Sequence, residues 1–188
     1  MPDDEGGGSV YFIPERRRGQ AKAHRVDVQP DGSFRLGARN VTLDGEVARR
    51  YAALRTALAQ KDLNLCSQNA NTAVLPREDG DGWIVYVLSS TTEPGKAFIG
   101  GHNRIEIAAD GTVGKVEHSA RSCIGIDATA TDGDGEKFAY QMVTHIVSDM
   151  PWETHVFQAM TLDVQMFVPT ERAIWRIEGG RLWKLAVE

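Results

Sequence analysis

The order of apolar and polar positions along the chain predicts a protein built mainly from β-hairpins. The run Trp83–Leu88 is apolar throughout and rich in β-branched and aromatic residues, which is typical of a strand covered on both faces. Apolar and polar residues alternate in His24–Gln29 and Ser33–Leu36, which flank a turn at Pro30-Asp31-Gly32. In the hairpin predicted there, Val28 faces Phe34 and Val26 faces Leu36.

A second hairpin is predicted where Ala97–Ala109 and Thr112–His118 meet at Asp110-Gly111. Asp-Gly tolerates the positive φ angles of a type I′ turn, so we expect a two-residue loop. The resulting register places aliphatic pairs on one face and opposite charges on the other. The predicted pairs are His102 with Ser119, Asn103 with His118, Arg104 with Glu117, Ile105 with Val116, Glu106 with Lys115, and Ala108 with Val113.

A third hairpin is predicted at the end of the chain, between Ala173–Glu178 and Arg181–Val187. The intervening Gly179-Gly180 is another candidate for a type I′ turn. In this register Ile174 faces Leu185. Arg176 faces Trp183, which predicts a cation–π pair.

Helical spacing of apolar residues is clearest in Asp44–Asp62. Asp44 can cap the helix, and Val47, Tyr51, Leu54 and Leu58 form one stripe that we expect to be buried.

A second helix is predicted over Lys137–Ser148, with Pro151 ending it. Strands are predicted near Thr154–Met160 and Val164–Val168.

Together these elements predict an α+β fold, in which an antiparallel sheet of hairpins is combined with two helices. The order suggests two helix-plus-meander units, in the style of cystatin-like and NTF2-like proteins. We expect Met1–Ser9, which is acidic and rich in glycine, to be disordered. Residues 10–188 are expected to form one domain.

Charge argues against a dedicated nucleic-acid binder, because the 188 residues carry a formal net charge of -5. The basic segment Glu15–Arg25 allows an RNA- or phosphate-binding patch. It lacks aromatic residues on which bases could stack, and this favours a solvated loop.

No apolar run is long enough to cross a membrane, and the first residues lack a signal-peptide pattern. The expected location is therefore the cytoplasm, or the periplasm if a signal peptide was removed. Cys66 and Cys123 fit no metal-binding spacing. Free buried thiols are expected in a reducing compartment, and a disulfide is possible after export.

The stretch from Thr144 to Phe157 carries the most distinctive candidate chemistry. His145, Asp149, Glu153 and His155 fall on both sides of Pro151, and two imidazoles with two carboxylates suit zinc or non-haem iron. A third nitrogen could come from His102 or His118. The spacing is not that of HExxH, however, and a polar connection that satisfies backbone groups is the alternative. If this segment is helical, His145 lies away from the apolar stripe and at the surface.

A possible ligand site lies at Gly100-Gly101, because glycines let a ligand approach the backbone. His102, Asn103 and Arg104 follow directly and could bind an anion. The alternative is a β-bulge at the start of a strand. His118, opposite Asn103, and Trp152 complete the set of candidate ligand-binding residues.

Nucleophile, Rossmann and P-loop motifs are absent from the sequence. Four tryptophans among hairpins suit a recognition surface. We therefore expect a non-enzymatic binding module, inhibitor- or immunity-like, with a protein partner or small ligand and no cofactor. The alternatives are a metal-dependent hydrolase or isomerase using His145 and His155, and a homodimer that pairs exposed strand edges.

Gly100-Gly101-His102-Asn103-Arg104, Asp110-Gly111 and the stretch His145–Phe157 resemble a family of small proteobacterial proteins with no assigned activity. Trp175–Arg181 is similar to the closing hairpin of that family. The resemblance covers roughly residues 83–183 and leaves out the basic N-terminal segment. It implies a grouping and no particular reaction.

Overall fold

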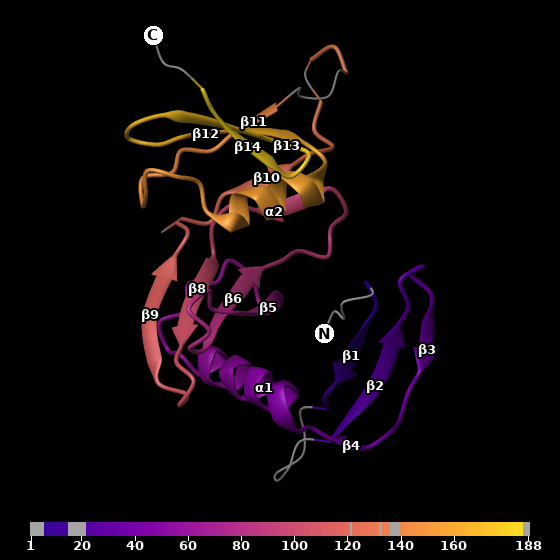
Figure 1. The fold of residues 1–188 in the computed structure, drawn as a ribbon. Coiled ribbons are helices and arrows are strands. Elements are labelled where there is room, and N and C mark those ends of the chain that lie inside the picture. The colour runs from indigo at the N-terminus through magenta and orange to yellow at the C-terminus, as the bar shows by residue number, and fades with distance from the viewer. Residues whose placement is uncertain (1–5, 15–21, 121, 132, 136–139, 186–188) are drawn as a thin grey trace. The chain divides into compact units, whose positions relative to one another are not determined.

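The computed structural model describes residues 6–14, 22–120, 122–131, 133–135 and 140–185. Within these residues the fold is α+β, with mostly antiparallel sheets and two helices (Figure 1). By its contacts the chain divides into two compact units, Met1–Ala52 and Ala53–Glu188. The first helix, α1, runs across this division. None of the described helices is both long and apolar enough to cross a bilayer.

The first unit is an antiparallel sheet in which β2 pairs with each of the other strands. The predicted hairpin is confirmed, because Val28 pairs with Phe34 and Val26 with Leu36. Gly8 and Ser9 begin a strand, contrary to the disorder expected there, whereas 1–5 and most of the basic segment, 15–21, lie outside the described residues. The strands are β1 (Gly8–Phe12), β2 (Lys22–Val28), β3 (Phe34–Leu36) and β4 (Val41–Thr42).

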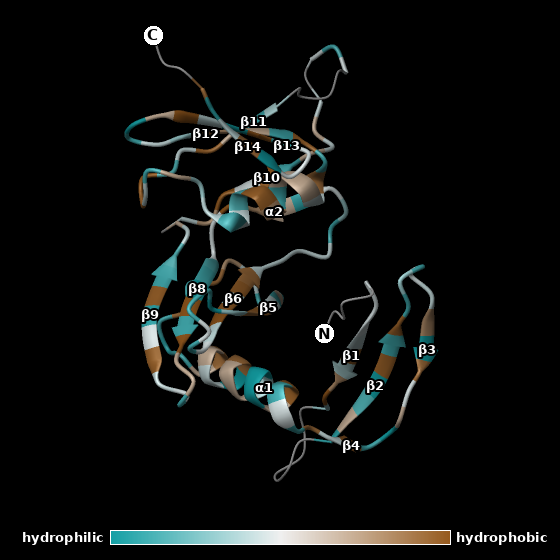
Figure 2. Ribbon diagram, viewed as in Figure 1, coloured by the Kyte–Doolittle hydropathy of each residue, from teal (hydrophilic) through white to brown (hydrophobic). Residues whose placement is uncertain are grey.

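The second unit begins with a four-stranded antiparallel sheet in the order β5-β6-β8-β9. Its strands are β5 (Ala70–Pro76), β6 (Trp83–Ser89), β8 (His102–Ile107) and β9 (Val113–His118). The prediction that Trp83–Leu88 is covered on both faces is confirmed, since all but one residue of β6 are buried. Figure 2 shows β6 as a largely hydrophobic strand. Strand β5 was not predicted from the sequence, because its composition is mixed and includes Asn71 and Pro76.

Helix α1 (Gly45–Leu58) lies where the apolar spacing predicted a helix, and Leu54 of the predicted stripe packs against the core, but the two buried residues of the helix lie off that stripe. Ala53 and Ala57 are buried and pack in a cluster with Val85, Val87 and Ile105. Leu58 is 42% exposed, so its predicted burial is wrong. Two small side chains let the helix lie close to β-branched residues of the sheet, which larger side chains at those positions would prevent.

The β8–β9 hairpin keeps only part of its predicted register. Asn103 pairs with His118, Arg104 with Glu117 and Ile105 with Val116, as predicted, but Ile107 pairs with Val113. The Ala108 N–H donates to the Thr112 carbonyl, and Gly111 has φ 86° while Asp110 does not have a positive φ. The loop therefore has three residues, and a bulge opposite Glu106 restores the outer pairs.

The bulge also breaks two predicted side-chain pairs. Ala108 does not face Val113, and Glu106 contacts Arg77 at 3.5 Å. Lys115 instead reaches the Glu117 carboxylate at 2.5 Å.

A second sheet, in the order β11-β12-β13-β14, is packed against α2. Its elements are β11 (Tyr140–Met142), α2 (Glu153–Leu162), β12 (Gln165–Pro169), β13 (Ile174–Glu178) and β14 (Arg181–Leu185). The closing hairpin is confirmed: Ile174 pairs with Leu185, and Gly179 and Gly180 both have positive φ. The Arg176 guanidinium lies 4.8 Å from the Trp183 ring centroid, as the cation–π prediction required.

The second predicted helix is wrong in position. Residues 137–139 lie outside the described part of the chain, and Tyr140–Met142 is a strand that pairs in parallel with β12. Helix α2 covers residues 154–160, where a strand was predicted. Pro151 stands directly before Trp152, the N-cap of α2, instead of ending a helix, and there its missing N–H breaks no helical hydrogen bond.

A two-stranded ribbon of β7 (Lys96–Phe98) and β10 (Gly125–Asp127) completes the second unit. The long strand predicted over residues 97–109 is thus two strands in different sheets. Ile99 and Ile126, next to or within this ribbon, join a buried cluster with Ala159, Met166 and Ile177.

Candidate functional site

A cavity of about 590 Å³ lies in the second unit, between the β7–β10 ribbon and the segment that contains β11. Most of the wall formed by the described residues is apolar, and the polar groups in that part include hydroxyls, one carboxylate and one imidazole. The described residues that line the cavity are Ile99, Ser119, Ala120, Ser122, Ile124, Gly125, Ile126, Asp127, Ala130, Tyr140, Gln141, Met142, Val143, Thr144 and His155.

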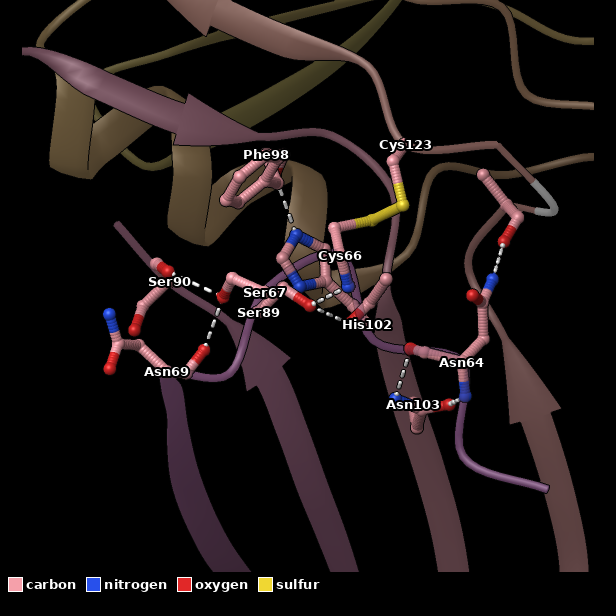
Figure 3. The surroundings of a disulfide bond; sticks show 12 residues. Asn64, Cys66, Ser67, Asn69, Ser89, Ser90, Phe98, His102, Asn103 and Cys123 are labelled. Carbon is pink, nitrogen blue, oxygen red and sulfur yellow. Dashed lines mark hydrogen bonds between the residues drawn. A yellow bond between two sulfur atoms is a disulfide. The ribbon is translucent and has the colours of Figure 1, made fainter. Parts of the chain in front are cut away.

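A disulfide between Cys66 and Cys123 anchors one wall of this cavity (Figure 3). Cys123 stands between Ser122 and Ile124, which both line the cavity. The expectation of free buried thiols is therefore wrong, and the side chain of Cys123 is exposed. The bond joins residues 57 positions apart in the sequence, so a distant part of the chain restrains the segment that carries Cys123.

Gly100 and Gly101 allow the chain itself, not a ligand, to approach the backbone. A Cβ on Gly100 would lie 1.8 Å from the Ser122 carbonyl oxygen, and one on Gly101 would lie 2.5 Å from the Cys66 sulfur. The Ser89 hydroxyl accepts the Cys66 N–H and donates to the Gly101 carbonyl. These glycines lie between β7 and β8, directly before the start of β8, where a β-bulge was the alternative expectation, and they let Ser122 and Cys66 approach the backbone.

His102 is buried and serves the contact between β8 and α2. Its Nε2 is 2.8 Å from the Phe98 carbonyl oxygen, which Figure 3 shows, and the Gln158 amide on α2 contacts both groups. Burial lowers the pKa of His102, while the Phe98 carbonyl acts in the opposite direction. His102 therefore holds two elements together away from the cavity lining.

Asn103 is fully buried and also has a structural role. Its Oδ1 accepts the Asn64 backbone N–H at 2.8 Å, and its Nδ2 donates to the carbonyls of Asn64 and Val87. His118 Nδ1 lies 2.8 Å from the same Oδ1. Two predicted ligand-binding residues, Asn103 and His118, are thus occupied by the chain.

Arg104 forms an ion pair with Glu117 at 3.0 Å instead of presenting a free guanidinium. Tyr86 lies nearby on β6, and burial together with the Glu153 carboxylate raises its pKa to about 12, while Arg104 opposes the shift. Arg104 Nε is buried without a partner. This group is a polar layer between sheet and helix, and none of its members lines the cavity.

The structure does bring His145 and His155 together, with ring centroids 4.8 Å apart. His145 is 2% exposed, so its predicted surface position is wrong, and its Nε2 lies 2.9 Å from the Ser148 hydroxyl. The Trp152 backbone N–H donates to His155 Nδ1 at the start of α2. Burial lowers the pKa of the His145 ring. Burial, together with the nearby His145, lowers the pKa of His155 to about 4.

The two carboxylates of the predicted metal cluster point to other partners. Asp149 lies 3.4 Å from Arg172, and Glu153 is exposed and interacts with Tyr86. Among the described residues, no three His, Cys, Asp or Glu side chains are grouped so that they could hold a metal ion.

Ser119 is the cavity residue that sequence reasoning missed as a candidate. It is 5% exposed and lines the cavity, and its hydroxyl has no hydrogen-bond partner. Nothing in its local sequence distinguishes it from an ordinary strand-end serine. Of the predicted site residues, only His155 lines the cavity.

Comparison with protein-family models gave no match to this chain, and neither did comparison with curated proteins or with solved structures.

Proposed function

We propose that this protein is a non-enzymatic binding module that holds a small, mainly apolar molecule in the cavity of its second unit. The cavity is the observation that carries the proposal. At about 590 Å³ it falls within the range of pockets that enclose small organic ligands.

The chemistry of the lining supports binding more than catalysis. Ile124 and Met142 line the cavity and are 54% and 60% exposed, and a bound apolar molecule would remove the part of that surface that it contacts from water. His155 is neutral at physiological pH and is engaged through Nδ1 by the Trp152 N–H. A ring held in this way lacks a free basic nitrogen with which to act as a general base near pH 7.

The disulfide supports an exported protein over a cytoplasmic one. Disulfides persist in oxidising compartments such as the periplasm, whereas the cytoplasm keeps thiols reduced. Export also fits a binding protein that encounters small molecules outside the cytoplasm.

Binding of N-phenyl-1-naphthylamine, an uncharged apolar fluorophore, tests the proposal. We expect saturable fluorescence enhancement with one site per chain. Gly125→Trp should abolish it, because Gly125 lines the cavity and a side chain there meets no atom within 4 Å at its Cβ. Gly133→Trp is the matched control, since its added Cβ also meets nothing and it does not line the cavity. Equal binding by both variants would contradict the proposal.

A metal-dependent enzyme is the second candidate, and the 4.8 Å approach of the His145 and His155 rings favours it. Elemental analysis of untagged protein tests this function. It requires stoichiometric zinc or iron that is lost in His145→Ala/His155→Ala. An empty native protein that folds normally would exclude the candidate.

A further inference from the structure

Strand β5 lies at the edge of its sheet, and one side of its backbone has no neighbour among the described strands. Its register with β6 is continuous over seven residue pairs, without a bulge. An edge strand of this kind presents a row of N–H and C=O groups to which another extended chain can bind. The residues of β5 determine which chain fits this edge.

Two hydrogen bonds at the ends of the ladder show which backbone groups face outward. The Asn69 carbonyl accepts the Ser90 N–H at 3.0 Å, and the Arg77 N–H donates to the Gly82 carbonyl at 3.1 Å. Bonded and non-bonded pairs alternate along an antiparallel ladder, so the odd-numbered residues of β5 bond to β6. The outward N–H and C=O groups belong to Ala70, Thr72 and Val74, with the Pro76 carbonyl in addition. Among the described residues, none bonds to these groups.

The side chains of β5 suit pairing with another uncharged segment. The strand reads Ala-Asn-Thr-Ala-Val-Leu-Pro, without a charged residue, and five of its seven residues are exposed. Charged side chains commonly protect strand edges, and at the opposite edge of this sheet β9 carries Lys115 and Glu117. Strand β14, at an edge of the other four-stranded sheet, carries Arg181 and Lys184. Strand β5 lacks this protection, and Pro76 at its end limits how far a partner can pair.

We infer that β5 pairs antiparallel with β5 of a second copy of this chain, about a twofold axis at Thr72. In this register Thr72 faces its own counterpart, and Ala70 faces Val74 of the second copy. Each of these three residues supplies both an N–H and a C=O. A register shifted toward Pro76 would include a residue that has no N–H. The two four-stranded sheets then join into one continuous sheet.

The side chains that meet in this register favour self-pairing. A residue on the twofold axis faces itself, so a charge there would repel its copy. The central pair is Thr72 with Thr72, and threonines can hydrogen-bond across two strands. On the other face of the sheet Asn71 lies opposite Ala73, so no two bulky side chains meet. No β5 residue lines the cavity, and the inference is independent of the proposed function.

Opposite charges at Thr72 test the inference, with sedimentation equilibrium of the disulfide-bonded full chain as the measurement. We expect the native chain to dimerise. Thr72→Lys and Thr72→Glu should each raise the dissociation constant about fivefold, because like charges then meet at the axis. Thr72 is exposed, so both variants should fold. An equimolar mixture of the two variants should recover the native affinity as heterodimers, because Lys then faces Glu.

Thr42→Lys, at an exposed position of β4 in the first unit, is the matched control and should dimerise like the native chain. A native chain that stays monomeric overturns the inference, as does a Thr72→Lys variant that dimerises as tightly as the native chain. A mixture that does not recover also overturns it, because Thr72 would then not lie opposite Thr72. Equal weakening in Thr42→Lys would show that added charge, and not the edge of β5, controls association.

Discussion

Buried histidines dominate the second unit at the residue scale. His102, His145 and His155 are each at most 3% exposed, and burial lowers the pKa of all three. A ring that is kept neutral in the fold but takes up a proton when unfolded makes stability depend on pH.

We predict that acid destabilises the protein between pH 6.5 and about 4. The unfolded chain binds a proton at His155 below its ordinary pKa of 6.5, whereas the folded chain binds it only near its pKa of about 4. The stabilisation that depends on neutral His155 is fully present above pH 6.5. It is lost as the pH falls toward 4, which lowers the free energy of unfolding by about 3 kcal/mol for His155 alone. Urea unfolding at a series of pH values measures it.

His155→Gln should flatten this dependence, because Gln keeps an acceptor for the Trp152 N–H and does not titrate. His24→Gln, at an exposed position of the first unit, is the control and should keep the slope. An unchanged slope in His155→Gln would rule out this explanation.

Asn103 gives a second prediction at the residue scale. Asn103→Ala should lower the free energy of unfolding by about 3 kcal/mol, because it removes the buried hydrogen bonds to the Asn64 N–H and to the carbonyls of Asn64 and Val87. Asn71→Ala, at an exposed position of β5, should change it by less than about 0.5 kcal/mol. Chemical denaturation distinguishes them, and equal effects would show that Asn103 has no structural role.

Among the elements, the buried face of α1 can be tested by substituting Leu58, from the predicted stripe, and Ala57, which is buried in the structure. Leu58→Ala should cost less than about 1 kcal/mol, because Leu58 is 42% exposed. Ala57→Leu should cost about 1–3 kcal/mol, because a larger side chain does not fit a position that is 0% exposed. Thermal unfolding measures both losses. A larger loss of stability for Leu58→Ala than for Ala57→Leu would show that the stripe predicted from the sequence is the buried one.

The contribution of the disulfide to stability can be tested by replacing both cysteines. Cys66→Ser/Cys123→Ser should lower the free energy of unfolding by about 4 kcal/mol, since the closed loop is long. Because Cys123 stands in the cavity wall, fluorophore affinity should fall as well. Mass spectrometry with and without a reductant confirms the bond in the native protein. Unchanged stability and affinity would mean that the wall does not depend on the bond.

At the scale of the whole molecule, both buried apolar clusters lie in the second unit. We therefore predict that a chain that begins at Leu43, and so keeps α1 entire, unfolds cooperatively and binds the fluorophore with native affinity. Circular dichroism and the binding assay measure the two properties. Loss of cooperative unfolding would show that the second unit needs the first. The homodimer alternative stays a prediction, which sedimentation of the full chain tests.

Elements that depend on neighbouring residues can be predicted from the amino-acid sequence. The turns at Gly32 and Gly179-Gly180, the first helix and the apolar strand β6 follow from backbone preferences and from residue periodicity. In each case, neighbouring residues contain all the information that the element needs. The closing hairpin therefore has its predicted register, and Arg176 lies against Trp183.

Features that depend on residues far apart in the chain arise from packing and could not be predicted from local patterns. Residues 140–142 became a strand because β12 offers a parallel partner, and α2 formed after Pro151, not before it. Ser119 and His155 line the same cavity although they come from different elements, and the disulfide beside its wall likewise joins distant segments. Burial of His155, and hence its lowered pKa, likewise arises from packing that no local pattern records.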